Sequence, residues 1–291
     1  MGPERSRRPE ATLDNKRSPR AVIWVHWGHS YLSLLERSVR SAAKHVDADR
    51  YVISDAPIPA SIPAKNIIYP FTAAGFMRKP EALSQIVPDG HSVLLFLDSD
   101  TVVLDNIDFG FEQAAKHGLA ISIASNYSLA DYYDTSAVML KEGLSVAGQS
   151  LYNSGVIFYR TSHDVLALLK EWHAVAIRNL GALLTDQEAL TIAMLASDFN
   201  PYVLSKSFNV RGLLEVLSGT AFIWHAKAPV PEGINSPAAG TSRRILVQGR
   251  LRPLADAFLA GGAFALAVRK ATDRLYLTYR KVALLMGWSP P

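Results

Sequence analysis

The chain has 291 residues, of which 49% are hydrophobic and 19% charged, and this balance predicts a globular protein with one large domain. It contains no cysteine, which excludes disulfides, cysteine catalysis and thiolate metal sites and gives no support to a secretory route.

Charge is distributed unevenly along the chain. Residues 21–240 hold 15 basic and 21 acidic side chains, residues 1–20 hold 6 and 3, and residues 241–291 hold 9 and 2. The first segment is polar and has no apolar run, so we expect it to be disordered and to be neither a signal peptide nor an anchor. A basic end on an acidic body favours an anionic partner, and without a zinc-finger or RNA-binding motif this partner is a membrane surface rather than nucleic acid. We expect a cytoplasmic protein that can attach to the inner face of a membrane.

Hydrophobic periodicity predicts alternating strands and helices in the first half of the chain. A buried strand is expected over 21–25, a helix over 31–45 and a second strand over 50–54. Three prolines then mark a loop, and a helix over 80–86 with proline in its first turn leads into an apolar strand at 93–97. These elements form a βαβ-type half-domain.

The second half continues the alternation and shows no internal repeat. Thr185 and Glu188 have the spacing of a capping box at the start of a helix. The expected strands cover 119–124, 155–159, 202–204 and 221–224, and the expected helices cover 165–179 and 186–196. We therefore predict an α/β domain over residues 21–240, with a mixed, mainly parallel sheet flanked by helices.

Two carboxylates follow the apolar run at 93–97, namely Asp98 and Asp100, with Ser99 between them. Five consecutive large apolar residues are typical of a strand buried on both faces, and ligands gather beyond the carboxyl ends of such strands. Carboxylate oxygens favour Mg²⁺ or Mn²⁺, and these ions keep positions open for nucleotide phosphates. The alternative interpretation is an ordinary turn rich in aspartate.

The segment Asp98-Ser99-Asp100 resembles the DxD signature of GT-A glycosyltransferases, which hold a nucleotide sugar through a divalent cation. Three further segments occur in the order found in the retaining, family 8-like members, a group that includes glycogenin and the bacterial lipopolysaccharide galactosyltransferases. These segments are 152–158 (YNSGVIF), 185–188 (TDQE) and 223–229 (IWHAKAP). The resemblance spans residues 21–229 and implies a Rossmann-like GT-A fold and hexosyl transfer from a nucleotide diphosphate sugar.

The resemblance also implies a metal site of Asp98, Asp100 and His225, holding Mn²⁺ or Mg²⁺. His225 departs from the family pattern, because it is followed by Ala-Lys-Ala-Pro and not by a longer segment that contains glycine. A histidine that ends an apolar strand is otherwise more often structural than a ligand.

Four further residues are candidates for contact with the nucleotide. By resemblance, Ser99 and Lys79 lie against it, Lys227 clamps the diphosphate and Tyr31 stacks on the base. For Lys79 the alternative is a solvated basic pair with Arg78, and for Tyr31 it is an aromatic core position on a helix.

Asn153, Asp186 and Gln187 match the polar residues that surround the donor sugar in the family. Glycosyl transfer passes through an oxocarbenium-like transition state, which needs polar groups around the anomeric carbon. Asp186 is expected to grip sugar hydroxyls, and Gln187 to lie near the reacting face. Because an amide is a poor covalent nucleophile, we expect attack from the side of the departing phosphate. The alternatives are a turn residue for Asn153 and a helix cap for Asp186.

Two functions from other classes remain open at this point. The segment 97–102 (LDSDTV) also fits the phosphatase pattern DxDx[TV], although that motif normally follows the first strand of its domain, and no later GDxxxD pair is present. The other alternative is a non-catalytic protein that binds carbohydrate or nucleotide on the same fold.

The family favours UDP-glucose or UDP-galactose as donor and leaves GDP-mannose possible. The acceptor is open among glycans, lipid-linked sugars, peptides and small metabolites, and we expect residues 126–150 to contact it. The oligomeric state is not predicted.

The tail at 241–291 is expected to be a basic amphipathic helix. Its apolar stretch 254–268 has 15 residues, short of the ~20 that span a bilayer, so it is not a transmembrane helix. Basic side chains interleaved with Tyr and Trp over 269–288 favour a helix in an anionic lipid interface. The alternative is a helix packed on the core or in a dimer interface.

Overall fold

The computed structural model describes most of the chain between residues 19 and 246, and the predictions for residues 1–18 and 247–291 lie outside it. The described ranges are 19–129, 135–145, 148–183, 185–211, 215–217, 219–235 and 244–246. None of the helices in these ranges combines the length and the apolar character that crossing a bilayer requires.

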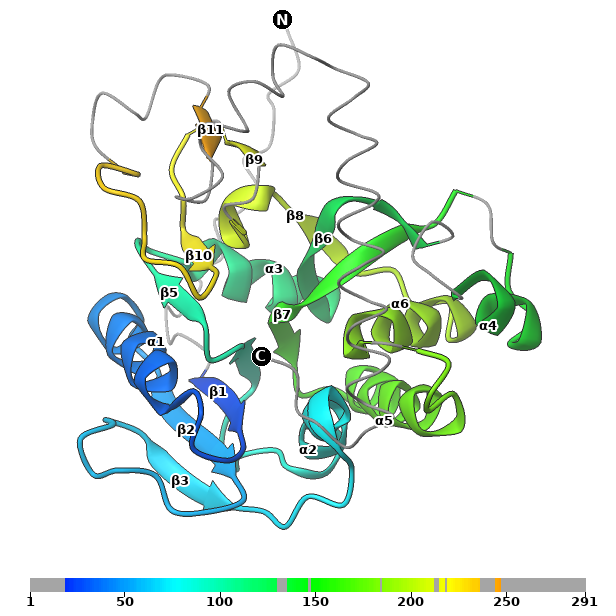
Figure 1. Ribbon diagram of the computed structural model, residues 1–291, viewed down its shortest axis with the longest axis horizontal. Helices are drawn as coiled ribbons and strands as arrows, with labels where there is room; N and C mark the ends of the chain where they lie inside the picture. Colours follow the sequence, from blue (N-terminus) through cyan, green and yellow to red (C-terminus); the bar gives the residue numbers. More distant parts are fainter. Residues whose placement is uncertain are drawn as a thin grey trace, which may run out of the picture.

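A central seven-stranded sheet has the strand order β3-β2-β1-β4-β7-β6-β8 (Figure 1). Among these strands β7 runs antiparallel to both of its neighbours, and the remaining pairs are parallel. The strands are β1 (Arg20–His26), β2 (Asp49–Ser54), β3 (Lys65–Ile68), β4 (Val93–Leu97), β6 (Leu119–Ser128), β7 (Ser150–Arg160) and β8 (Tyr202–Leu204). The predicted mixed, mainly parallel sheet is confirmed.

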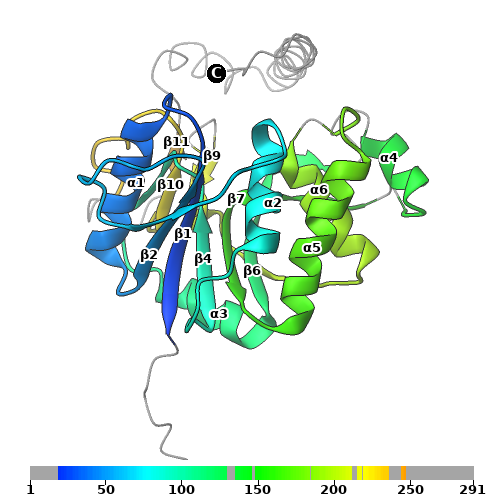
Figure 2. The same ribbon diagram turned by 90° about the horizontal axis from the view of Figure 1, so that it is seen from below.

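Helices cover both faces of this sheet and produce three layers (Figure 2). On one face lie α1 (Leu32–His45) and α3 (Asp108–His117). On the other face lie α2 (Arg78–Gln85), α5 (His163–Arg178) and α6 (Asp186–Ala196). Because side chains alternate along a strand, a strand covered on both faces must be apolar at every position, and this explains the continuous apolar runs of β1 and β4.

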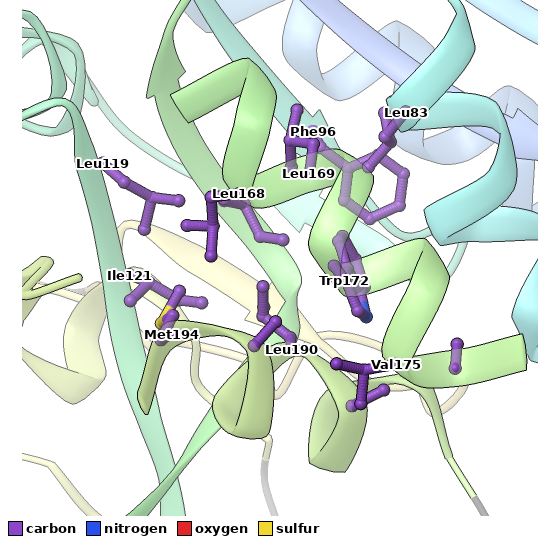
Figure 3. Packing of buried hydrophobic residues seen from close by; sticks show 14 of the residues in the cluster. Leu83, Phe96, Leu119, Ile121, Leu168, Leu169, Trp172, Val175, Leu190 and Met194 are labelled. Atoms are coloured by element: carbon purple, nitrogen blue, oxygen red, sulfur yellow. The ribbon is translucent and has the colours of Figure 1, made fainter. Parts of the chain in front are cut away.

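The layer of α2, α5 and α6 packs closely against the sheet (Figure 3). Leu83 of α2 and Trp172 of α5 lie near Phe96 of β4 (Figure 3), Leu190 of α6 belongs to the same cluster, and all four side chains are at most 1% exposed. Burial of each large apolar side chain contributes about 1.5–3 kcal/mol, so this cluster is a main source of stability for the strand that leads to Asp98.

Two small antiparallel sheets complete the fold beside the carboxyl end of β4. In one sheet, β5 (Thr101–Val103) pairs with β10 (Ile223–His225), and in the other, β9 (Glu215–Leu217) pairs with β11 (Arg244–Leu246). The short elements η1 (Gly75–Met77), α4 (Thr135–Lys141) and η3 (Lys206–Phe208) connect the larger ones.

Several elements differ from the sequence predictions. The strand predicted at 155–159 is the eleven-residue β7, so Asn153 lies inside a strand and is not a turn residue. Arg20 already belongs to β1, and the described residues of the predicted helical tail, 244–246, form strand β11. The patterns did not indicate β3, β5, α3, α4, β9 or β11, most of which are short elements.

Candidate active site

The site begins where β4 ends, and a tight turn there carries the two carboxylates. Asp98 extends the pairing with β7, because its N–H donates to the Gly155 carbonyl at 2.9 Å. The Thr101 N–H and hydroxyl then donate to the Asp98 carbonyl at 3.1 and 2.8 Å. This turn reverses the chain into β5 and leaves Asp98, Ser99 and Asp100 partly exposed at the carboxyl edge of the sheet.

The small sheet brings His225 to the same place. Thr101 of β5 is the register partner of His225 in β10, and the Ala226 N–H donates to the Asp100 carbonyl at 3.1 Å. His225 Nε2 lies 3.3 Å from Asp100 Oδ1 and 3.5 Å from Asp98 Oδ2. The potential ligand atoms of these three residues lie within 4.8 Å of one another, as a metal site requires.

Gly155 makes room for this cluster. A Cβ atom at this position would lie 2.1 Å from His225 Cε1 and 2.7 Å from Asp98 Oδ2, closer than such atoms approach. Any other residue would therefore push the imidazole away from the carboxylates. The glycine of the segment 152–158 thus has a packing reason to be there.

Lys79, a predicted site residue, is buried between two carboxylates. Its ammonium lies 3.0 Å from Asp98 Oδ1 and 2.9 Å from Asp186 Oδ2, and its side chain is 4% exposed. It also donates to the carbonyl and the hydroxyl of Ser154 at 3.3 and 3.2 Å. Lys79 is therefore not half of a solvated basic pair, whereas the guanidinium of Arg78 lies over aromatic rings.

The start of α6 presents Asp186 and Gln187. The predicted capping box of Thr185 and Glu188 is present and fixes the first turn of this helix. Asp186 Oδ2 accepts a hydrogen bond of 2.5 Å from the Ser154 hydroxyl, so Asp186 is tied to β7 as well as to Lys79. Both Asp186 and Gln187 are buried, at 3% and 9% exposed.

Asn153 also lies in the interior of the site and is 2% exposed. Its side-chain oxygen accepts hydrogen bonds from the Gly155 N–H and from Asn209, which in turn contacts His225. Asn209 was not predicted, and no local pattern in the sequence marks it.

Tyr31 and Lys227 come together at the rim. The Lys227 ammonium donates to the Tyr31 hydroxyl at 3.0 Å and lies 4.6 Å from the centre of its ring. Arg37 donates to the Ala226 carbonyl at 3.2 Å and so holds the segment between His225 and Lys227. Tyr31 is half-buried at the start of α1, where its ring packs against a cation.

Charge is strongly coupled across the site. Burial opposes the charge of Lys79, but Asp186 and Asp98 outweigh it and raise the pKa of Lys79. Burial also opposes ionisation of Asp98 and Asp100, yet Lys79 next to Asp98 and His225 next to Asp100 hold both pKa values below the usual range. Burial disfavours the imidazolium, but the two carboxylates raise the pKa of His225 to about 9. Lys79 pairs with Asp98 and Asp186, and Asp100 faces only the imidazole of His225, so the site favours additional positive charge.

A mixed, mainly parallel sheet with a carboxylate pair after β4 and a histidine beside it is consistent with the Rossmann-like GT-A fold. A family model of nucleotide-diphospho-sugar transferases matches residues 40–213, and the chain belongs to this family. The match includes Asp98, Asp100 and the start of α6, and it ends before His225. No curated protein matches the chain.

Proposed function

We propose that the protein is a metal-dependent, retaining hexosyltransferase that uses a nucleotide diphosphate sugar, with a UDP-hexose as the favoured donor. The observation that carries the proposal is the cluster of Asp98, Asp100 and His225 in a chain of the nucleotide-diphospho-sugar transferase family. The resemblance of the segments at 152–158, 185–188 and 223–229 to family 8-like enzymes supports retention and the hexose donor.

The donor set suits a hard divalent cation. Two carboxylates and one imidazole fit Mn²⁺ or Mg²⁺, and the partial exposure of Asp98 and Asp100 leaves access for diphosphate oxygens. Asp98, Asp100 and His225 would hold the ion. When bound, it would supply Lewis-acid stabilisation of the charge that develops on the nucleoside diphosphate.

The remaining residues orient the donor in this proposal. Lys79 fixes Asp98 and Asp186 relative to each other, so that the start of α6 and the end of β4 keep a constant separation. Gln187 lies next to Asp186 at this helix start and faces the reacting side of the sugar, whose hydroxyls Asp186 binds. Asn153 acts from within β7 on the same site.

In this proposal the nucleotide contacts three residues at the edge of the site. Tyr31 packs against the base, and Ser99 and Lys227 contact the ribose and the diphosphate. The ammonium of Lys227 lies two residues beyond His225 and would offset phosphate charge. No observation favours GDP-mannose over a uridine donor, and the acceptor hydroxyl approaches from the side of residues 126–150.

A lipid-linked acceptor fits the chain best. The tail at 241–291 carries 9 basic and 2 acidic side chains and several aromatic residues, a composition suited to an anionic lipid surface. Co-sedimentation with anionic and neutral vesicles, for the full chain and for one that ends at Arg252, tests this part. Equal recovery of both chains in the supernatant, with the shorter one unfolded, would favour a tail packed on the core.

The phosphatase alternative loses support. Two strand–helix units precede β4, the strand that leads to Asp98, and the chain belongs to a family of nucleotide-diphospho-sugar transferases. A non-catalytic protein that binds the same nucleotide sugar would differ from the proposed enzyme only in lacking sugar transfer.

A panel of nucleotide sugars tests the proposal. Thermal stability of the full chain is measured with each donor, with Mn²⁺ or with excess EDTA, and the stabilising donors are then assayed for release of the nucleotide. A ligand at 100 times its Kd adds about 2.7 kcal/mol of stability, a shift that is easily detected. We expect stabilisation by UDP-hexoses that requires Mn²⁺. Equal stabilisation in EDTA would contradict the metal assignment, and binding without release of UDP to any acceptor would favour the non-catalytic protein.

A further inference from the structure

A chain of two buried amides connects β7 to the histidine of the site. We propose that Asn209 is a positioning residue that, together with Asn153, keeps the proton of neutral His225 on Nδ1 and thereby points the lone pair of Nε2 at Asp98 and Asp100. The inference rests on the proposed function, since it assigns a role to residues behind the metal site. The chain is defined by three hydrogen bonds between the side chains or backbone of Gly155, Asn153, Asn209 and His225.

The direction of every hydrogen bond follows from one backbone group. The Gly155 N–H can only donate, so the Asn153 atom that lies 2.9 Å from it must be the side-chain oxygen. That oxygen also lies 2.8 Å from the side-chain amide of Asn209, and since it accepts, the Asn209 atom must be the nitrogen. The other polar atom of Asn209 is therefore its oxygen.

This oxygen determines which nitrogen of the neutral imidazole carries the proton. It lies 2.8 Å from His225 Nδ1 and can only accept, so Nδ1 must carry a proton. In the neutral ring the second nitrogen, Nε2, is then unprotonated, and it is this atom that faces Asp98 and Asp100 at 3.5 and 3.3 Å. A metal-binding histidine needs this tautomer, and a partner on the other ring nitrogen commonly fixes it.

The surroundings hold the amide chain rigidly. Asn153, Asn209 and His225 are 2%, 5% and 8% exposed, so water does not compete for their hydrogen bonds. The residue after Asn209 is bonded on both sides to β10, because the Val210 N–H donates to Ile223 and the Val210 carbonyl accepts from His225. This pairing holds the backbone of Asn209 beside β10, and the side-chain hydrogen bonds to Asn153 and His225 orient its amide.

The test measures Mn²⁺ affinity, by electron paramagnetic resonance of free Mn²⁺ in the presence of UDP, for wild type, Asn209→Leu, His225→Ala and the double variant. Leucine has a similar volume and no acceptor, and loss of such a partner typically weakens metal affinity by 10–100-fold. We expect this loss for Asn209→Leu and no additional loss when His225 is already alanine, because Asn209 acts through that ring. A merely structural role would weaken affinity by the same factor in both backgrounds.

Asn179→Leu is the matched control. Asn179 is also buried and makes three side-chain hydrogen bonds, two with Lys141 and Glu142 at the end of α4 and one with the Val175 carbonyl of α5. It should lower the melting temperature of the metal-free protein and leave Mn²⁺ affinity unchanged. If Asn209→Leu does not fold, Asn209→Asp, which keeps the acceptor, should bind Mn²⁺ within about threefold of wild type or more tightly, and a tenfold loss would overturn the inference.

The possible outcomes distinguish the role of Asn209 from the proposed metal-dependent function. Wild-type affinity in Asn209→Leu, or a loss in the double variant that multiplies the two single losses, would overturn the role of Asn209 alone. Absence of Mn²⁺ binding by the wild-type chain would overturn the proposed function and this inference with it.

Discussion

The two oxygens of Asp98 face two different kinds of cation site. Oδ1 contacts Lys79, a cation of the chain itself, which also binds Asp186. Oδ2 faces His225, beside Asp100, in the cluster assigned to a divalent ion. The same carboxylate thus belongs to a permanent ion pair on one side and to a ligand set on the other.

Burial explains why the two sides have different roles. The Lys79 side chain is 4% exposed, so its ion pairs are shielded from water and lock α2, β4 and α6 together. The side chains of Asp98 and Asp100 are 29% and 24% exposed, which gives an exchangeable ion and a diphosphate access. Substitutions on the Lys79 side should therefore change mainly stability, and substitutions on the Asp100 side mainly metal binding, although both sides share Asp98.

The largest effect is expected from the exposed side. Asp100→Asn keeps the shape of the side chain but removes the charge that holds a cation, so transfer should fall by roughly 10³-fold or more. Mn²⁺-dependent stabilisation by UDP should disappear, while the metal-free variant should still fold cooperatively. Transfer assays and thermal melts with and without Mn²⁺ measure both quantities.

Asp47→Asn is the control for this variant, since Asp47 is an exposed carboxylate after the end of α1. It should behave as wild type. Undiminished transfer by Asp100→Asn, or full wild-type activity in excess EDTA, would remove the metal from the mechanism.

Lys79→Met should give the opposite pattern. It leaves the buried carboxylate of Asp186 and the inner oxygen of Asp98 without their cation, and breaking a buried ion pair in this way costs roughly 3–5 kcal/mol of stability. Because a positive charge is removed next to Asp98, Mn²⁺ affinity of the folded fraction should stay equal or increase. Denaturant unfolding and Mn²⁺ titration test the two parts, with the exposed Lys44→Met as control. A large loss of metal affinity at unchanged stability would mean that the two sides are not separable.

Gln187→Ala tests the proposed contact with the donor sugar and leaves Lys79 and the metal ligands unchanged. Its proposed contacts form with the sugar in the transition state, so turnover should fall roughly 100-fold, while the Kd for UDP stays within about twofold. Steady-state kinetics and nucleotide titration give these values. An equal loss in turnover and in UDP affinity would instead assign Gln187 a structural role in the first turn of α6.

The smallest effect concerns Glu188 of the capping box, a buried acid without a direct cation partner. Burial raises its pKa from 4.5 to about 7, so the folded state binds more protons than the unfolded state between these pH values. Stability should therefore be highest below pH 4.5 as far as this group is concerned, and decrease as pH rises through about 7. Relative to Glu188→Gln, the wild type should lose roughly 1–3 kcal/mol across this range. A flat difference would show that the hydrogen bonds from Thr185 keep the carboxylate ionised.

The sequence predicted the elements that are long or strongly periodic. The strands β1, β2 and β4 and the helices α1, α2, α5 and α6 were found because burial on both faces, or on one stripe, leaves a clear apolar pattern. The strands β3 and β5 were missed because they have only four and three residues, too few for periodicity to appear. The antiparallel direction of β7 depends on tertiary pairing, which a strand's own residues do not encode.

The site was predictable where a local motif marks it. Asp98 and Asp100 stand one residue apart at the end of a strand, and the structure brings His225 to them as predicted. The burial of Lys79 was not predictable, because it follows another basic residue, Arg78, and its partners lie 19 and 107 residues away. Asn209 has no local signature at all, since its role follows from contacts with β7 and β10 that only the folded chain creates.

Anomalous diffraction at the manganese edge, from crystals of the full chain with Mn²⁺ and UDP, tests the central claim most directly. We predict a peak within coordinating distance of Asp98, Asp100 and His225, with Lys79 still in contact with the other oxygen of Asp98. UDP bound without manganese beside these three residues, or manganese held by a different group of ligands, would contradict the account.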